Sequence, residues 1–224
     1  MSGIIDCPET MSGGVKIFVA VETLFICISS CLIQLGIFKA TGKFAGWQSD
    51  FSYTLLRIIS VVALQLYVSE IVAHVRFAWG FEANTIDQVV GASFLTSFVT
   101  DTILGVTLVL HRVAYTIYPY KASSVLTCKL LQCYLIGVSI FHVILFVVMV
   151  TPYAGYQFCP KSLERFPVEG SATTVVLWIN KICNYMVGLT AFTAYSVICI
   201  FLFIRGNLTL RSNAEVRLTL QVND

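Results

Sequence analysis

The chain is poor in charge. Only 12% of its 224 residues are Asp, Glu, Lys or Arg, whereas about a quarter of a typical soluble domain is charged. Hydrophobic residues make up 57% of the sequence and the mean hydropathy is +0.84. These values exclude an ordinary soluble domain and predict an integral membrane protein, with the lipid bilayer as its first partner. The net charge of +2 gives no ground for nucleic-acid binding.

The chain also lacks the patterns of catalytic and metal sites. It contains no G-x-S-x-G, no H-E-x-x-H and no phosphate-binding glycine loop, and no cysteine pair has C-x-x-C spacing. Its three histidines are His74, His111 and His142. His74 and His142 could form one haem-ligating pair across a bundle, but a second pair is absent. We therefore expect no enzyme activity, no cofactor and no metal ion.

Five apolar stretches are each long enough to cross a hydrocarbon core of about 30 Å as a helix rising about 1.5 Å per residue. The sequence thus predicts an all-α, polytopic transmembrane helical bundle. The predicted spans are residues 15–38, 53–77, 86–110, 130–153 and 173–204. Residues 205–224 form a separate tail, in which Ser212 and Glu215 have capping-box spacing and mark the start of a further helix.

The distribution of Lys and Arg predicts the orientation, because basic residues are enriched in cytosolic loops. The N-terminal segment has no basic residue before the first span, so that span is expected to act as its own insertion signal. Most basic residues then fall on one side of the membrane, and the N-terminus is predicted to face outside. Four basic residues oppose this trend: Lys16, Arg76, Lys161 and Arg165.

Cysteines pair on the oxidising side of a membrane. Only Cys7 and Cys159 are predicted to lie there. The two could form a disulfide that joins the N-terminal arm to the loop before the fifth span, or they could remain free thiols.

Charged residues inside the spans need a partner or water, because a charge in hydrocarbon is costly. Glu22, Glu70 and Lys181 lie at similar predicted depths, and Asp101 lies deeper. Two interpretations stay open. The four residues could form a polar ligand pocket open to the outside, or Lys181 could form a structural ion pair with Glu70 or Glu22. Arg57, near the cytosolic end of its span, is expected to extend to the interface.

The third span ends in His111-Arg112-Val113-Ala114-Tyr115-Thr116-Ile117-Tyr118-Pro119. A basic residue at the end of a span can be a simple topology anchor. The segment also resembles the D-R-Y-x-A-I-x-x-P motif that ends the third helix of rhodopsin-like seven-helix receptors, with Arg112 and Pro119 on the matching positions. Among these receptors, the chain is most similar to the divergent serpentine chemoreceptors of nematodes. His111 replaces the acid of the motif. Asp87 stands where the family has a cysteine, so the usual disulfide to Cys159 cannot form.

This resemblance implies a seven-helix architecture of which five spans are present, with residues 205–224 leading into the sixth. It implies a plasma-membrane, G-protein-coupled chemosensory receptor that detects an external small molecule between the outer halves of its helices. His111, Arg112 and Pro119 would face a heterotrimeric G protein. A chain truncated after five spans is expected not to signal alone, and it could instead modulate full-length relatives. The alternative from another class is a transporter or channel subunit whose intramembrane charges Glu22, Glu70, Asp101 and Lys181 line a conduction path.

Overall fold

The computed structural model of the chain describes residues 12–42, 51–79, 84–118, 122, 125–151, 153–160, 162–168, 170 and 172–204. Within these residues, five helices are long and apolar enough to cross a membrane. They are α1 (Gly13–Thr41), α2 (Phe51–Trp79), α3 (Asn84–Ile117), α5 (Cys128–Val150) and α6 (Thr173–Ile204). The protein is therefore an all-helical, multi-pass membrane protein, as its composition predicts.

The helices match the predicted spans and extend most of them. α3 continues to Ile117, beyond the predicted end at residue 110, so that His111 and Arg112 lie on its last turns. α5 begins after Thr127, whose hydroxyl accepts a hydrogen bond from the Leu130 amide at 3.4 Å and so caps the helix. It ends at Val150, three residues before the predicted end. α6 has the predicted bounds.

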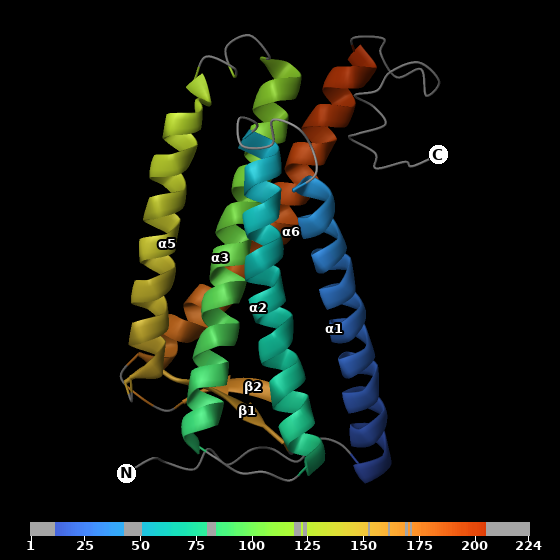
Figure 1. Ribbon diagram of the computed structural model, residues 1–224, viewed down its shortest axis with the longest axis vertical. Coiled ribbons are helices and arrows are strands. Elements are labelled where there is room, and N and C mark those ends of the chain that lie inside the picture. Colours follow the sequence, from blue (N-terminus) through green and yellow to red (C-terminus); the bar gives the residue numbers. More distant parts are fainter. Residues whose placement is uncertain are drawn as a thin grey trace.

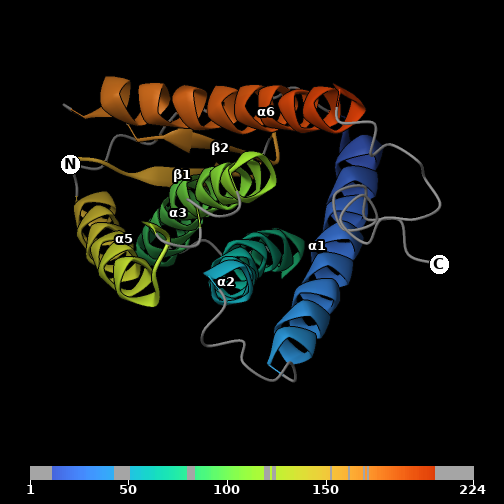
Figure 2. The ribbon, with the colours of Figure 1, turned by 90° about the horizontal axis from the view of Figure 1, so that it is seen from above.

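α3 is the central helix of the bundle. It packs against α2, α6, α5 and the first strand of a hairpin, while α1 packs mainly against α2. Seen from above, α2, α5 and α6 lie around α3, and α1 lies on the far side of α2 (Figure 2). Two apolar cores hold α3 in place. One contains Leu95, Val99, Met149 and Val176, and the other contains Leu55, Val62, Leu104 and Leu131.

A two-stranded antiparallel hairpin connects α5 to α6, where a loop was predicted from the sequence. It consists of β1 (Tyr156–Cys159) and β2 (Glu164–Pro167), with Phe158 opposite Arg165. The hairpin lies at the end of the bundle where α2 ends and α3 and α6 begin (Figure 1). By the predicted orientation this is the outer end, and the opposite end is here called the inner end.

The hairpin sits directly on α3 at Gly91. A Cβ atom built on Gly91 would lie 1.4 Å from the carbonyl oxygen of Tyr156, so no larger residue fits without moving β1. The absence of a side chain at this position allows the strand backbone to contact the helix. The hairpin is thus packed onto the helices at their outer end and is well placed to add side chains to a site there.

Candidate functional site

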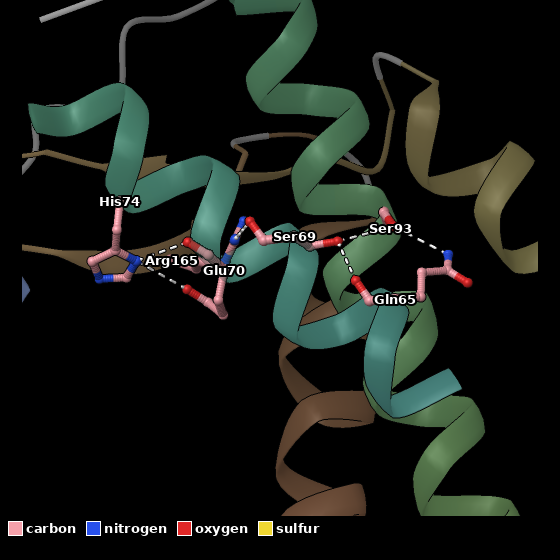
Figure 3. A network of polar contacts seen from close by, with 6 residues as sticks. All are labelled: Gln65, Ser69, Glu70, His74, Ser93 and Arg165. Carbon is pink, nitrogen blue, oxygen red and sulfur yellow. Dashed lines mark hydrogen bonds and ion pairs between the residues drawn. The ribbon is translucent and has the colours of Figure 1, made fainter. Parts of the chain in front are cut away.

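A buried ion pair joins the hairpin to α2 (Figure 3). The Nε of Arg165 donates a hydrogen bond to Oε1 of Glu70 at 2.8 Å, and the Nη2 of Arg165 donates to the carbonyl oxygen of Ser69 at 3.1 Å. The exposed fractions of the two charged side chains are only 5% for Arg165 and 15% for Glu70. Because both charges are largely removed from water, each depends on the other for compensation.

His74 extends this ion pair by one helical turn along α2. Its Nδ1 lies 3.0 Å from the carbonyl oxygen of Glu70 and 3.5 Å from Oε2 of the same residue. Both neighbours are acceptors, so Nδ1 carries a proton in this arrangement. The ring is buried and contacts Phe158 of β1, with 5.1 Å between ring centroids. His74, Glu70 and Arg165 therefore form one cluster across α2 and the hairpin.

A second group of polar side chains continues the network between α2 and α3. The hydroxyl of Ser93 on α3 accepts a hydrogen bond from Nε2 of Gln65 at 3.1 Å and one from the hydroxyl of Ser69 at 3.0 Å. Ser69 itself is buried, and its carbonyl oxygen is the acceptor for Arg165. The outer halves of α2 and α3 and the hairpin are thus linked through one continuous polar network (Figure 3).

Aromatic rings enclose the guanidinium of Arg165. Its Cζ lies 4.4 Å from the ring centroid of Phe94 and 5.8 Å from that of Phe158, within the range of cation–π attraction. Tyr156 stacks on Phe94 with 6.3 Å between centroids. Burial raises the pKa of the Tyr156 hydroxyl, the nearby Arg165 charge opposes this shift and the Glu70 charge adds to it. Tyr156 is therefore a neutral hydrogen-bonding group at physiological pH.

The intramembrane charges predicted to form one pocket do not gather in the structure. Glu22 on α1 and Lys181 on α6 are exposed on the outside of the bundle, and Lys181 contacts the ring of Trp178 at 5.7 Å. The expected pairing of Lys181 with Glu70 or Glu22 is wrong, because Glu70 pairs with Arg165 and Lys181 forms no ion pair with any described residue. The similar predicted depths of Glu22 and Lys181 could not show that their helices, α1 and α6, lie on different sides of the bundle.

Asp101 lies on α3, away from the Arg165 cluster. Its Oδ1 is buried without a hydrogen-bond partner among the described residues, and so are the hydroxyl oxygens of Thr96 and Ser97. Ser93, Ser97 and Asp101 are spaced four residues apart, so they share one face of α3. This face carries polar groups from the Arg165 network toward the middle of the bundle.

The HRVAYTIYP segment is helical up to Ile117 and lies at the inner end of α3. The Nδ1 of His111 lies 3.0 Å from the hydroxyl of Ser52 at the start of α2, and its ring packs on Tyr115 with 4.5 Å between centroids. Arg112 is half-buried, and its guanidinium forms no ion pair or side-chain hydrogen bond within the part of the chain that the structure describes. Pro119, the other matching residue of the motif, lies outside the described residues.

Cys159 is disulfide-bonded and almost fully buried. Its predicted partner, Cys7, lies outside the described residues. Asp87, at the position where the receptor family has a cysteine, forms a bidentate ion pair with Arg76 of α2, with Nη2 of Arg76 at 3.2 Å from Oδ2. The described residues include no group of three or more His, Cys, Asp or Glu side chains that could hold a metal ion.

The role of Arg165 was not predicted, although the sequence contained a signal for it. Arg76 and Arg165 are two of the four basic residues on the predicted outer side, and both turn out to be paired with an acid, Asp87 and Glu70. A basic residue on the predicted outer side, where basic residues are few, thus indicated that an acidic partner lies close to it. Gln65, Ser69 and Ser93 carry no charge, and nothing in the sequence distinguished them from other polar residues in spans.

Comparison of the chain with protein-family models and with curated proteins found no match. The two ends of the bundle differ in their polar groups. The outer end presents a buried ion pair within a polar network, in which only Nη1 of Arg165 has no hydrogen-bond partner among the described residues. The inner end presents an arginine whose charge is not neutralised by a described side chain.

Proposed function

We propose that the protein is a receptor-like protein of the plasma membrane that detects an external small molecule at the outer end of the bundle and engages a heterotrimeric G protein at the inner end. The signal in this proposal passes along α3. This helix contributes Ser93 to the polar network at one end and Arg112 to the surface at the other.

The observation that carries the proposal is that Arg112 is half-buried and pairs with no described side chain. An arginine keeps its charge under all physiological conditions, and this one is half-buried at the end of the central helix. An internal partner would make it a structural residue. Since no described side chain pairs with Arg112, the guanidinium is free to bind an external acceptor such as a backbone carbonyl or a carboxylate of a partner protein.

The outer end supports the sensory half of the proposal. A ligand that inserts between α2, α3 and the hairpin would exchange hydrogen bonds with Gln65, Ser69 or Ser93, or would displace Arg165 from Glu70. Each exchange changes how α2 and α3 are held against each other. Polar groups that are already hydrogen-bonded favour ligands that replace those bonds, because unpaired buried groups are costly.

Photo-crosslinking at the inner end tests the G-protein contact. A photoreactive amino acid in place of Tyr115, which is exposed and lies within one turn of Arg112, is expected to form an adduct with a co-expressed Gα subunit. The same probe in place of Tyr153, exposed at the opposite end, should give none. Arg112→Ala should remove the adduct, and Lys129→Ala, which also deletes an exposed cytosolic charge, should keep it.

An equal yield of adduct from both probe positions, or an unchanged yield in Arg112→Ala, would contradict the proposal. If Arg112 is only a topology anchor, a different pattern is expected, in which Arg112→Ala and Lys129→Ala both lower the amount of inserted protein. Surface biotinylation in the same cells separates these outcomes.

The N-out orientation belongs to the same proposal and has an internal probe. Asn207-Leu208-Thr209 is an N-glycosylation sequon that the orientation places in the cytosol. It should stay unmodified in a secretory cell. An endoglycosidase-sensitive shift in mass that disappears in Asn207→Gln would reverse the orientation and, with it, the assignment of the two ends.

A further inference from the structure

Two opposite charges are exposed on the membrane-length helices more than one turn from either helix end. Glu22 on α1 is the one exposed acid among the described residues of the five helices, and Lys181 on α6 is exposed eight residues after the start of its helix at Thr173. The other described acids have different surroundings: Glu70 and Asp87 are paired, and Asp101 has a buried oxygen. Glu22 forms no ion pair or hydrogen bond with any described residue.

Each of these charges lies between two exposed aromatic rings. On α1, Phe18 and Phe25 flank Glu22 and are 69% and 71% exposed; these three residues are called the acidic stripe. On α6, Trp178 and Tyr185 flank Lys181 and are 60% and 75% exposed; these three are called the basic stripe. Spacings of three and four residues place the members of each stripe on one helix face.

Glu22 and Lys181 lie at similar distances from the starts of their helices. At about 1.5 Å per residue, Glu22 lies about 14 Å along α1 from its start and Lys181 about 12 Å along α6. α6 starts further from the outer end than α1 does and is the more tilted helix (Figure 1). The long Lys side chain brings its ammonium outward, toward the level of Glu22.

We propose that the chain self-associates through these stripes, with Glu22 of one copy paired to Lys181 of a second copy. Charge complementarity selects this arrangement. A symmetric contact of two α6 helices would place Lys181 against Lys181, and a symmetric contact of two α1 helices would place Glu22 against Glu22. Pairing α1 with α6 neutralises both charges and stacks the aromatic rings of one stripe on those of the other.

The contact is heterologous, because each copy uses a different surface for each neighbour. α1 and α6 lie on different sides of the bundle (Figure 2), so one copy can use both stripes at once. Assemblies larger than a dimer are therefore expected. A variant that has lost one stripe can only cap such an assembly.

Energy transfer between labelled copies of the 224-residue chain in lipid bilayers tests the proposal. Donor and acceptor copies are reconstituted at a series of protein-to-lipid ratios, from which the association constant is obtained. Glu22→Lys and Lys181→Glu should each weaken association about tenfold, a typical effect of losing a strong polar contact between membrane helices. Lys39→Glu, which changes the charge of α1 by the same amount at an exposed position near its inner end, should leave association unchanged.

The decisive measurement is complementation between copies. Donor-labelled Glu22→Lys mixed with acceptor-labelled Lys181→Glu should regain the wild-type affinity, because both stripes of the first variant are then basic and both stripes of the second are acidic, and these mixtures should again form assemblies larger than dimers. All substituted residues are exposed, so circular dichroism of each variant should equal that of the wild type.

Three results would overturn the proposal. The first is energy transfer by the wild type no higher than random proximity in the bilayer, which is expected if both charges simply extend to the interface. The second is unchanged association of both single variants, and the third is no recovery in the mixture. Loss of association when a longer transcript supplies further spans would assign the basic stripe to those spans and would also overturn it.

Discussion

The ion pair between Arg165 and Glu70 gives the sharpest energetic prediction. Both side chains are largely buried, and removal of one member of such a pair leaves an uncompensated charge, which costs about 3–5 kcal/mol. Arg165→Met should therefore lower the free energy of unfolding by about that amount. This is a large part of the total stability of a typical domain, about 5–15 kcal/mol.

Removing the second charge should restore part of this loss. In Arg165→Met combined with Glu70→Leu, the buried carboxylate is gone, together with the longer contacts to His74 and Phe158. Two closer contacts also remain lost: the hydrogen bond to the Ser69 carbonyl oxygen and the cation–π contact with Phe94. Each is worth about 1 kcal/mol. The double variant should therefore be about 2 kcal/mol less stable than the wild type, so that the second substitution recovers about 1–3 kcal/mol.

Reversible SDS unfolding of the detergent-solubilised chain, followed by far-UV circular dichroism, measures these differences. The Cys159 disulfide must be intact in every variant, because it constrains the same hairpin. Glu164→Gln is the matched control, since Glu164 precedes Arg165 in β2 and is exposed; it should change stability by less than about 0.5 kcal/mol. The reasoning fails if Arg165→Met costs no more than this control, or if the losses from Arg165→Met and Glu70→Leu simply add in the double variant.

Three further predictions concern other parts of the bundle. Gly91→Ala should displace the hairpin, because its Cβ would clash with the Tyr156 carbonyl oxygen, whereas Gly105→Ala on the same helix meets no atom within 4 Å and should stabilise the chain by up to about 1 kcal/mol; proteolysis of the hairpin and thermal unfolding distinguish the two. Tyr134→Phe should cost about 1 kcal/mol through loss of the 2.6 Å hydrogen bond to Thr107, and an unchanged melting temperature would show that this bond contributes nothing. In cells in which the protein gives a ligand-evoked second messenger, Arg112→Ala should abolish that response per surface molecule, and Lys129→Ala should leave it unchanged; equal signalling by both variants would contradict the role proposed for Arg112.

The sequence predicted the helices well because their cause is local. A stretch that must satisfy all of its backbone hydrogen bonds in hydrocarbon has to be helical, so the run of apolar residues in 173–204 was enough to define α6 with its observed bounds. The hydrophobic run alone ends at residue 110, so it did not predict the extension of α3 through His111 and Arg112, which only the resemblance to the receptor motif implied. The hairpin was missed because four-residue strands have too short an alternating pattern to recognise.

The candidate site was predicted only in part. Glu70 was identified as a residue that needs a partner, but the partner proposed for it was wrong. The nearest opposite charge in predicted depth was Lys181, whereas the actual partner, Arg165, is 95 residues away in sequence and lies on the hairpin. Which charges meet depends on which helices are neighbours, and α6 presents Lys181 away from the bundle.

By itself, the sequence determined that this chain spans a membrane as a helical bundle, because scarcity of charge and lengths of apolar runs are properties of composition and order alone. It also showed that Glu22, Glu70, Asp101 and Lys181 are costly residues that need an explanation. Only the tertiary structure decided how each is accommodated: Glu70 by Arg165, Asp101 on an inner face of α3, and Glu22 and Lys181 on the outer surface. The physical reason is that the burial of apolar runs depends on hydrophobicity, which is summed along the chain, whereas an ion pair depends on a distance of a few ångströms that packing alone sets.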